Sequence, residues 1–192
     1  MGHETKRLFI AVDIDETTRE QVGRIAMRAR EAIGHTKASW VRQDRMHLTL
    51  YFFGSADGAL EARVRDRLAA SIGAPPFDMS FDGLGFFPER GWPRVLWLGV
   101  AEGLVALRRV HAAVGRGFSH ALPERTHDAF TPHLTLARFR DRVPRAKLAQ
   151  IASIPGSAGP ARIDRVTLYE SRLSPAGPIY IPLAEARLRP SG

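Results

Sequence analysis

Two short stretches of this sequence determine how the rest is interpreted: His47-Leu48-Thr49-Leu50 and His133-Leu134-Thr135-Leu136. The same four residues, His-Leu-Thr-Leu, recur after 86 positions. In an extended strand, residues i and i+2 face the same way, so each stretch places its histidine and threonine on one face and its leucines on the other. We therefore expect two strands, each with an apolar face toward a core and an imidazole and a hydroxyl on the opposite face.

The sequence around the two stretches repeats with the same offset. Each half contains an apolar run typical of a buried strand, two segments with apolar residues at helical spacing, and a closing strand. The aligned segments are 7–14 with 93–100, 15–33 with 101–119, 57–72 with 143–158, and 77–81 with 163–167. We therefore expect the same order of elements in each half: strand, helix, motif strand, helix and strand. A further strand is expected at 178–183.

This pattern predicts one α+β domain that covers residues 1–192. It has no long linker and no low-complexity segment. We expect a bilobal pseudo-twofold duplication with internal repeats at approximately 7–92 and 93–178. Each lobe is expected to be an antiparallel sheet with helices on its outer face, and the active site to lie in the central cleft.

Composition narrows the possible chemistry. The 192 residues include 28 Lys and Arg against 20 Asp and Glu, a formal net charge of +8, and no cysteine. The absence of cysteine excludes disulfides, thiol nucleophiles, iron–sulfur clusters and cysteine-based zinc sites. The basic balance indicates an anionic partner such as a nucleic acid or nucleotide. Because nearly all the basic residues are scattered arginines, the composition of a GC-rich genome is the alternative explanation.

The sequence shows no sign of membrane insertion. No apolar run approaches the roughly 18 residues of a membrane span. The polar start, Met1–Arg7, does not resemble a signal peptide. We expect a cytoplasmic monomer with no membrane partner.

Two histidines and two threonines in one cleft suit phosphodiester chemistry. Neutral imidazole accepts a proton from water or a hydroxyl near pH 7, and imidazolium donates one to a leaving oxygen. The hydroxyls of Thr49 and Thr135 can donate hydrogen bonds to phosphoryl oxygens, where charge sits in the transition state. His47 and His133 are therefore the candidate catalytic residues.

Two simpler readings compete with this one. A single His-x-Thr is typical of a half-buried strand with a hydrogen-bonded histidine, but two copies in matching surroundings favour a site. A zinc site needs three or four convergent ligands, and the chain has neither cysteine nor a His-Glu-x-x-His pattern. We expect no metal and no cofactor.

Some neighbouring residues are candidates for RNA contact. Along a regular strand Tyr51 and Phe53 continue the face of His47, whereas Arg138 has odd spacing from His133 and turns away from it. Tyr51 and Arg138 are the leading candidates, and an exposed arginine or a core aromatic is the alternative for each. Further candidates are Arg42, Arg45, Arg90 and Arg140 for phosphates, and Phe53, Trp92 and Phe139 for stacking.

Together these residues resemble the paired His-x-Thr motifs of the two-histidine phosphoesterase superfamily. Further stretches resemble its RNA 2′,3′-cyclic phosphodiesterase branch, also called 2′-5′ RNA ligases. They are Arg7–Ala11, Trp40-Val41, Gly83–Pro88, Pro93–Val100 and Leu168–Ser171.

The resemblance implies hydrolysis of a terminal 2′,3′-cyclic phosphate on RNA to a 2′-phosphomonoester without a metal, and the capacity to join RNA ends by a 2′-5′ linkage. It implies that His133 is the proton acceptor, that His47 is the proton donor, and that Thr49 and Thr135 hold the phosphoryl oxygens. The two motifs are nearly identical, so this division of roles comes from the resemblance alone. The implied partners are RNAs with cyclic phosphate ends, including tRNA fragments, and small nucleotides.

Two alternatives stay open at this level. The chain could act on 2′-5′ linkages or small cyclic nucleotides with the same residues. It could also be a non-catalytic RNA- or nucleotide-binding protein, although binding alone would not require both imidazoles.

Overall fold

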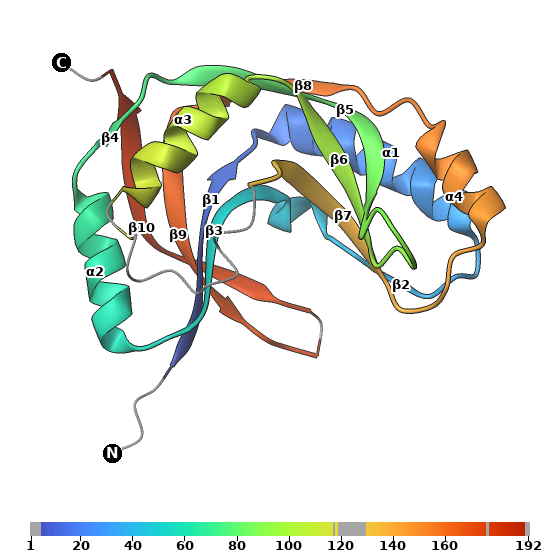
Figure 1. Ribbon diagram of the computed structural model, residues 1–192, viewed down its shortest axis with the longest axis horizontal. Coiled ribbons are helices and arrows are strands. Elements are labelled where there is room, and N and C mark those ends of the chain that lie inside the picture. The colour runs from blue at the N-terminus through green and yellow to red at the C-terminus, as the bar shows by residue number, and fades with distance from the viewer. Residues whose placement is uncertain (1–4, 117, 119–129, 176, 191–192) are drawn as a thin grey trace.

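The structure is a computed structural model that describes residues 5–116, 118, 130–175 and 177–190 (Figure 1). The described residues form ten strands, four α-helices and a 3-10 helix at Gln43–Arg45. The strands are β1 (Lys6–Asp13), β2 (Ala38–Trp40), β3 (His47–Ala56), β4 (Ile72–Gly73), β5 (Phe77–Phe87), β6 (Val95–Glu102), β7 (His133–Phe139), β8 (Ala158–Ile163), β9 (Arg165–Arg172) and β10 (Ile179–Arg189). The helices are α1 (Glu16–Ile33), α2 (Gly58–Ala69), α3 (Leu104–Gly115) and α4 (Arg145–Ala152).

The strands form two curved sheets of five, in the orders β3-β1-β9-β10-β4 and β2-β7-β6-β5-β8 (Figure 1). We call them the first and the second sheet. Helices α2 and α3 pack on the first, and α1 and α4 pack on the second. The predicted fold class, an α+β duplication with helices outside two sheets, is confirmed. One pairing departs from the expected antiparallel order, because β4 runs parallel to β10.

The sheets do not coincide with the sequence repeats. Strand β5 closes the first half of the chain but pairs with β6 of the second half, and β9 of the second half pairs with β1. Helices α1 and α3 also pack on the sheet built around the other half's motif strand. Each lobe therefore contains segments of both halves, so neither half could form a complete lobe by itself.

The helix boundaries follow local chemistry. Helix α1 begins where the Asp15 carboxylate accepts a hydrogen bond from the Thr18 N–H at 2.8 Å, and it ends at Gly34 with φ +60°. Helix α3 starts later than predicted, because β6 continues to Glu102 and Gly103 turns the chain with φ +82°. Residues 117 and 119–129, which include the end of the predicted helix, lie outside the described residues.

Three strands were not predicted from the sequence: β2, β4 and β8. Each is short, and β8 begins where the helix expected over 143–158 was to end. Helix α4 is only eight residues long and is followed by Pro155, which has no backbone N–H to continue a helix. Strand β5 runs beyond the predicted 77–81, because a bulge between Phe81 and Leu84 bends the strand without ending it.

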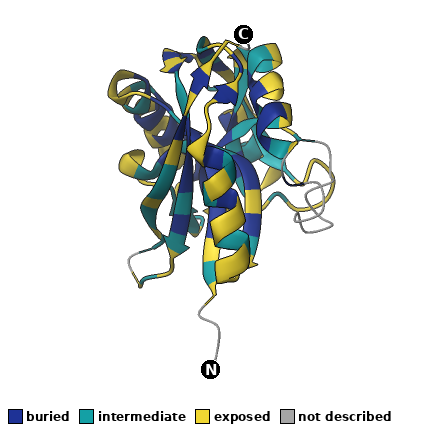
Figure 2. Ribbon diagram, turned by 90° about the vertical axis from the view of Figure 1, so that its left-hand side faces the viewer, coloured by how far each residue is buried: buried dark blue, intermediate teal, exposed yellow. Residues whose placement is uncertain are grey.

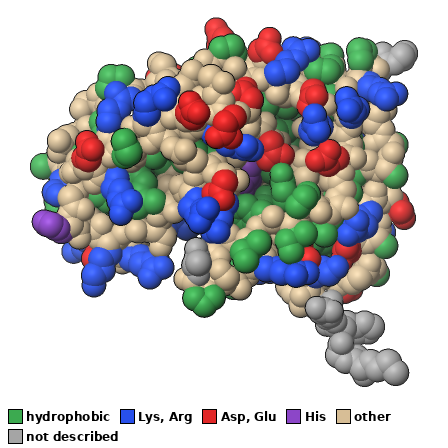
Figure 3. Space-filling view, turned by 180° about the vertical axis from the view of Figure 1, so that it is seen from behind, with side chains coloured by type: hydrophobic (Ala, Val, Ile, Leu, Met, Phe, Trp, Pro, Cys, Tyr) green, Lys and Arg blue, Asp and Glu red, His purple; other side chains and the backbone are tan. Residues whose placement is uncertain are grey.

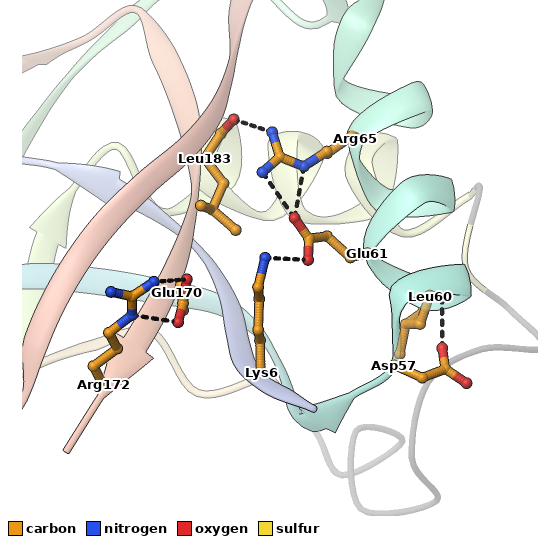
Figure 4. Close-up of polar contacts among 8 residues, drawn as sticks. All are labelled: Lys6, Asp57, Leu60, Glu61, Arg65, Glu170, Arg172 and Leu183. Atoms are coloured by element: carbon orange, nitrogen blue, oxygen red, sulfur yellow. Dashed lines mark hydrogen bonds and ion pairs between the residues drawn. The ribbon is translucent and has the colours of Figure 1, made fainter. Parts of the chain in front are cut away.

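Polar contacts fix helix α2 to the first sheet (Figure 4). The Glu61 carboxylate lies 2.9 Å from the Lys6 ammonium of β1 and accepts a hydrogen bond from Arg65 at 2.9 Å. Arg65 also donates to the carbonyl of Leu183, at the point where the register of β10 shifts. That carbonyl lies outside the regular ladder, so the guanidinium satisfies a group that the sheet leaves unpaired.

The leucines of both motifs lie in the core, as predicted. Leu48, Leu134 and Leu136 are fully buried and Leu50 is 4% exposed. Figure 2 shows buried residues concentrated along the strands and exposed residues on the outer sides of the helices. Within the described part of the chain, no helix is long and apolar enough to cross a membrane.

Candidate active site

The two motif strands, β3 and β7, come from different sheets and contact each other. Asp13 of β1 pairs with His47, and Gly99 of β6 pairs with His133. Asp13 and Gly99 are themselves 86 positions apart, so the offset seen in the sequence is also the offset of the strand register. The duplication therefore places the two histidines in equivalent positions on facing strands.

A β-bulge follows the threonine in both motifs. Thr49 and Tyr51 of β3 are two residues apart but pair with adjacent residues of β1. Thr135 and Ala137 of β7 pair in the same way with adjacent residues of β6. The extra residue is a leucine in both strands, and every side chain beyond it changes face. Both strands consequently show the same burial pattern over seven residues.

The bulge corrects the sequence reading of Tyr51. We expected it on the face of His47, but it is 4% exposed and lies on the core side, where its hydroxyl donates to the carbonyl of His111 at 2.9 Å. Phe53 and Phe139 are also buried, at 3% and 8% exposure. These aromatics are core residues, and Tyr51 is not available to touch a substrate in the cleft.

The same bulge turns Arg138 toward His133. Arg138 pairs with Val95, two positions from the Trp97 that pairs with Thr135, and is exposed. It therefore shares the face of His133, contrary to the expectation from a regular strand. Burial is the largest influence on two nearby groups, lowering the pKa of His133 and raising that of Tyr180, and the charge of Arg138 acts to lower both.

Both imidazoles are held by the same kind of hydrogen bond, from Nδ1 to a backbone carbonyl two residues earlier in the chain. The Nδ1 atom of His47 lies 2.8 Å from the carbonyl oxygen of Arg45, and Nδ1 of His133 lies 2.8 Å from that of Thr131. A carbonyl only accepts, so Nδ1 carries a hydrogen in each ring. Nε2 is thus the atom of each ring available for proton transfer.

Aromatic rings surround His47. Phe9 stacks on the imidazole with centroids 4.8 Å apart, and Tyr180 makes an edge-to-face contact with it, with centroids 5.1 Å apart. The ring centroid of Tyr169 lies 6.4 Å from that of His47, and Tyr169 stacks on Phe9. These ring contacts fix the plane of the His47 imidazole.

Burial lowers the pKa of His47 below its ordinary value. The hydrogen bond to the Arg45 carbonyl and the charge of Asp13 act in the opposite direction, while the charges of Arg19 and His133 lower the pKa further. The influence of His133 indicates that the two histidines are within electrostatic reach of each other.

Asp13 is the carboxylate paired with His47, and Asp44 also lines the cavity around that histidine. Asp13 accepts hydrogen bonds from the Tyr169 hydroxyl at 2.9 Å and from the Thr167 hydroxyl at 3.1 Å. These donors fix its position beside His47, its cross-strand neighbour. Gly99 stands at the equivalent place beside His133, so the second motif has no carboxylate there.

His133 has a different setting. Phe87 makes an edge-to-face contact with the imidazole, with ring centroids 5.0 Å apart, and the ring centroid of Trp97 lies 6.4 Å away. Burial lowers the pKa of His133, the hydrogen bond to the Thr131 carbonyl raises it, and the charge of Arg138 lowers it.

The candidate phosphate ligands Thr49 and Thr135 lie beside the histidines on the cleft faces of their strands, and both are partly buried. Among the described residues, neither hydroxyl has a hydrogen-bond partner, so both are available to a ligand. Around His47 lies a cavity of about 340 Å³, lined also by Asp13, Arg19, Arg45, Tyr169 and Tyr180. In the described ranges, no group of three or more His, Cys, Asp or Glu side chains could hold a metal ion.

The remaining candidates for RNA contact differ in whether they line a cavity, are exposed, or already have a partner in the protein. Arg45 lines the cavity at His47, and Trp92 is 49% exposed. Arg42 is paired with Asp44 at 3.0 Å, and Arg140 donates to the Ser39 hydroxyl. Figure 3 shows basic side chains mixed with acidic and apolar ones over one face, and a histidine visible in a central hollow.

Sequence reasoning missed Asp13, Tyr169 and Tyr180. A signal for Asp13 was present, because aligning the halves at 86 positions places it opposite Gly99. No comparable signal marks Tyr180. It lies on β10, which separates β9 from β4 in the first sheet, whereas the corresponding strands of the second sheet, β5 and β8, pair directly with each other.

Solved structures share this fold. A Thermus thermophilus protein superposes with a TM-score of 0.76 and 28% identity, covering 97% of this chain and 100% of that one. Escherichia coli LigT in complex with 3′-AMP superposes with a TM-score of 0.71 and 28% identity, covering 96% and 98%. A protein described as a phosphoesterase also superposes, with a TM-score of 0.63 and 27% identity, covering 95% of this chain and 98% of that one, so this is the fold of a class of phosphoesterases.

Sequence comparisons identify the family. A family model described as the 2′-5′ RNA ligase superfamily matches residues 15–174. The RNA 2′,3′-cyclic phosphodiesterase of Methanothermobacter thermautotrophicus is 38% identical, covering 95% of this chain and 98% of the relative. That of Thermotoga maritima is 32% identical, covering 94% and 95%. The chain belongs to the 2′-5′ RNA ligase superfamily.

Proposed function

We propose that this protein is an RNA 2′,3′-cyclic phosphodiesterase that opens a terminal cyclic phosphate to a 2′-phosphomonoester by acid–base catalysis. The observation that carries the proposal is the pair of equivalent imidazoles on facing strands, each with Nδ1 held by a carbonyl and Nε2 available. Relatives that match nearly the whole chain carry this activity in their names.

The reaction is an in-line displacement at phosphorus. His133 removes a proton from water through Nε2, the water oxygen bonds to phosphorus, and the bond from phosphorus to the 3′ oxygen breaks. His47 donates the Nε2 proton to that departing oxygen. Thr49 and Thr135 donate hydrogen bonds to the non-bridging oxygens, where negative charge accumulates, and Arg138 supplies a positive charge on the same face.

The assignment of roles is supported by the charges beside each ring. Asp13, which pairs with His47, favours its protonated form, as an acid requires. Arg138, on the face of His133, favours the neutral form, as a base requires. The motifs themselves are nearly identical, so these two neighbours make the site directional.

Product analysis tests the proposal. An RNA oligonucleotide ending in a 2′,3′-cyclic phosphate is incubated with the protein, and the new end is identified. A 2′-phosphate is the expected product. A 3′-phosphate would mean that the 2′ oxygen leaves, which contradicts the proposal, and an unchanged end would favour a binding protein.

A further inference from the structure

Helix α3 carries a histidine that the proposed mechanism does not use, His111. Its imidazole lies between two aromatic rings and is nearly parallel to both. The ring centroid of Tyr51 lies 4.3 Å from that of His111, with an angle of 9° between the planes, and that of Phe130 lies 4.0 Å away, with an angle of 7°. We call these three rings the aromatic sandwich. Rings packed this closely attract one another and restrict one another's positions.

The two outer rings of the sandwich belong to the two motifs. Tyr51 follows Thr49 on β3, and Phe130 lies three residues before His133, the first residue of β7. These strands belong to different sheets. One side chain of α3 therefore connects the two sheets beside both motifs.

The central ring of the sandwich is itself held in place. The Tyr51 hydroxyl donates its single hydrogen to the backbone carbonyl of His111 at 2.9 Å. The Nδ1 atom of His111 lies 3.3 Å from the same phenol oxygen, so it is the donor in that contact. Burial lowers the pKa of His111 and thus favours the neutral ring. Phe130 therefore packs against a ring with a fixed orientation.

The two outer rings differ in what else holds them. Tyr51 is 4% exposed and pairs with Ile10 in the ladder of the first sheet, which fixes its backbone independently of the stacking. Phe130 is only partly buried and precedes β7, whose ladder with β6 begins at His133. Loss of the central ring is consequently expected to displace Phe130 and to leave β3 in place.

The connection from Phe130 to His133 is short and stiff. The carbonyl of Thr131, the next residue, accepts the hydrogen bond from Nδ1 of His133 at 2.8 Å. Pro132 has a φ fixed at about −65°, and its ring restricts Thr131 to extended conformations. A movement of Phe130 therefore moves the carbonyl that orients the imidazole of His133.

We propose that His111 is a positioning residue for the catalytic base. By holding Phe130, it keeps the Thr131 carbonyl on Nδ1 of His133 and so directs Nε2 toward the attacking water. The inference rests on the proposed function, in which His133 is the base. His47 is held by the carbonyl of Arg45, on a different segment, so the acid should be unaffected.

His111→Ala tests the proposal in the opening of a 2′,3′-cyclic phosphate end. A catalytic group displaced by about 1 Å loses much of its effect, so kcat should fall by roughly 10- to 100-fold while KM stays within about twofold. The Thr131 carbonyl raises the pKa of His133, so weakening that hydrogen bond lowers it. The acidic limb of the pH profile, which the base sets, should move to lower pH by about 0.5–1 unit, and the alkaline limb should not move.

Two further variants identify the stacking as the cause. His111→Phe keeps a ring between Tyr51 and Phe130, so it should restore most of the rate and the position of the acidic limb. Phe130→Leu should reproduce the effect of His111→Ala, and it carries the same test if His111→Ala does not fold. The double variant should lose little more than either single one, because both remove the same contact.

Val110→Ala is the matched control. Val110 is a fully buried neighbour of His111 on α3 and has no ring to stack on Phe130. Its replacement should lower the free energy of unfolding without moving the acidic limb. Titration of the His133 ring protons by NMR measures the pKa of the base in every variant without an activity assay.

The inference is wrong if His111→Ala leaves kcat and the pKa of His133 at their wild-type values. It is also wrong if the rate falls while that pKa stays unchanged, as for a merely structural residue, or if His111→Phe restores nothing. A wild-type protein that does not open the cyclic phosphate refutes the proposed function. The NMR titration then still shows whether His111 holds the imidazole of His133.

Discussion

Replacement of Asp13 by asparagine tests the direction of proton transfer. Directly paired residues in antiparallel strands have Cβ atoms about 5 Å apart. Two unit charges about 6 Å apart, in an effective dielectric of about 20, attract by about 3 kcal/mol. Asp13 is partly exposed and shares its charge with two hydroxyl donors, so we expect about half of this, ~1–2 kcal/mol.

The pH dependence of the rate shows in which direction Asp13→Asn changes the activity. Asp13 raises the pKa of His47, so Asp13→Asn lowers it. An acid must be protonated before it acts, so the variant loses rate only where the pH is high enough for His47 to lose its proton. We expect a roughly 5- to 30-fold lower rate on the alkaline side of the profile and a nearly unchanged rate on the acidic side.

The assay is the rate of opening a 2′,3′-cyclic phosphate end between about pH 5 and 9. Asp78→Asn is the matched control, since it removes the same charge from an exposed ion pair with Arg162, and Asp13→Glu should recover part of the rate. If His47 were the base, a lower pKa would enlarge its neutral fraction and raise the rate on the acidic side. That outcome would refute the assignment, and so would a uniform loss at every pH.

Three further predictions concern the histidines and the packing around the cleft. His47→Ala and His133→Ala should each lower the rate of cyclic phosphate opening by roughly 10²- to 10⁴-fold while thermal unfolding stays cooperative, and near-normal turnover in either variant would contradict the mechanism. Tyr51→Phe removes a buried hydroxyl that donates to a carbonyl of α3. It should lower the free energy of unfolding, measured with denaturant, by about 1 kcal/mol without altering kcat, and a large loss of activity would mean that Tyr51 contacts the substrate after all. Gly85→Ala places a methyl group against the ring of Trp97 and should destabilise the fold by about 1–3 kcal/mol in the same measurement; an unchanged midpoint would mean that the ring moves freely.

The sequence was sufficient for the duplicated motif strands and for the class of fold. Alternation and helical spacing are local signals, so His47, Thr49, His133 and Thr135 could be placed on a common kind of face. The strand exchange between lobes could not be predicted, because it depends on contacts between segments far apart in the chain. The same holds for the short strands β2, β4 and β8, which are defined by their neighbours and have no strong pattern of their own.

The bulge in each motif strand limited the residue-level prediction. A shift of one residue reverses every side chain beyond it, so the period-2 rule gave the correct face as far as the threonine and the wrong face after it. Tyr51 was therefore assigned to the cleft and Arg138 away from it, and the structure reverses both placements. Nothing within a single motif marks the bulge, because leucine fits a regular strand as well as a bulged one.

The duplication supplies the two histidines, and the positions at which its halves differ set the charges beside them. Two identical half-sites would hold their imidazoles in identical surroundings, and neither ring would be favoured as acid or base. The equivalent positions Asp13 and Gly99 differ, and so do Phe52 and Arg138, which occupy the same place after the two bulges. Asp13 therefore pairs with His47 on one motif strand, whereas Arg138 lies on the face of His133 on the other. The proposed roles follow from this difference, because the carboxylate favours the protonated form of His47 and the guanidinium favours the neutral form of His133.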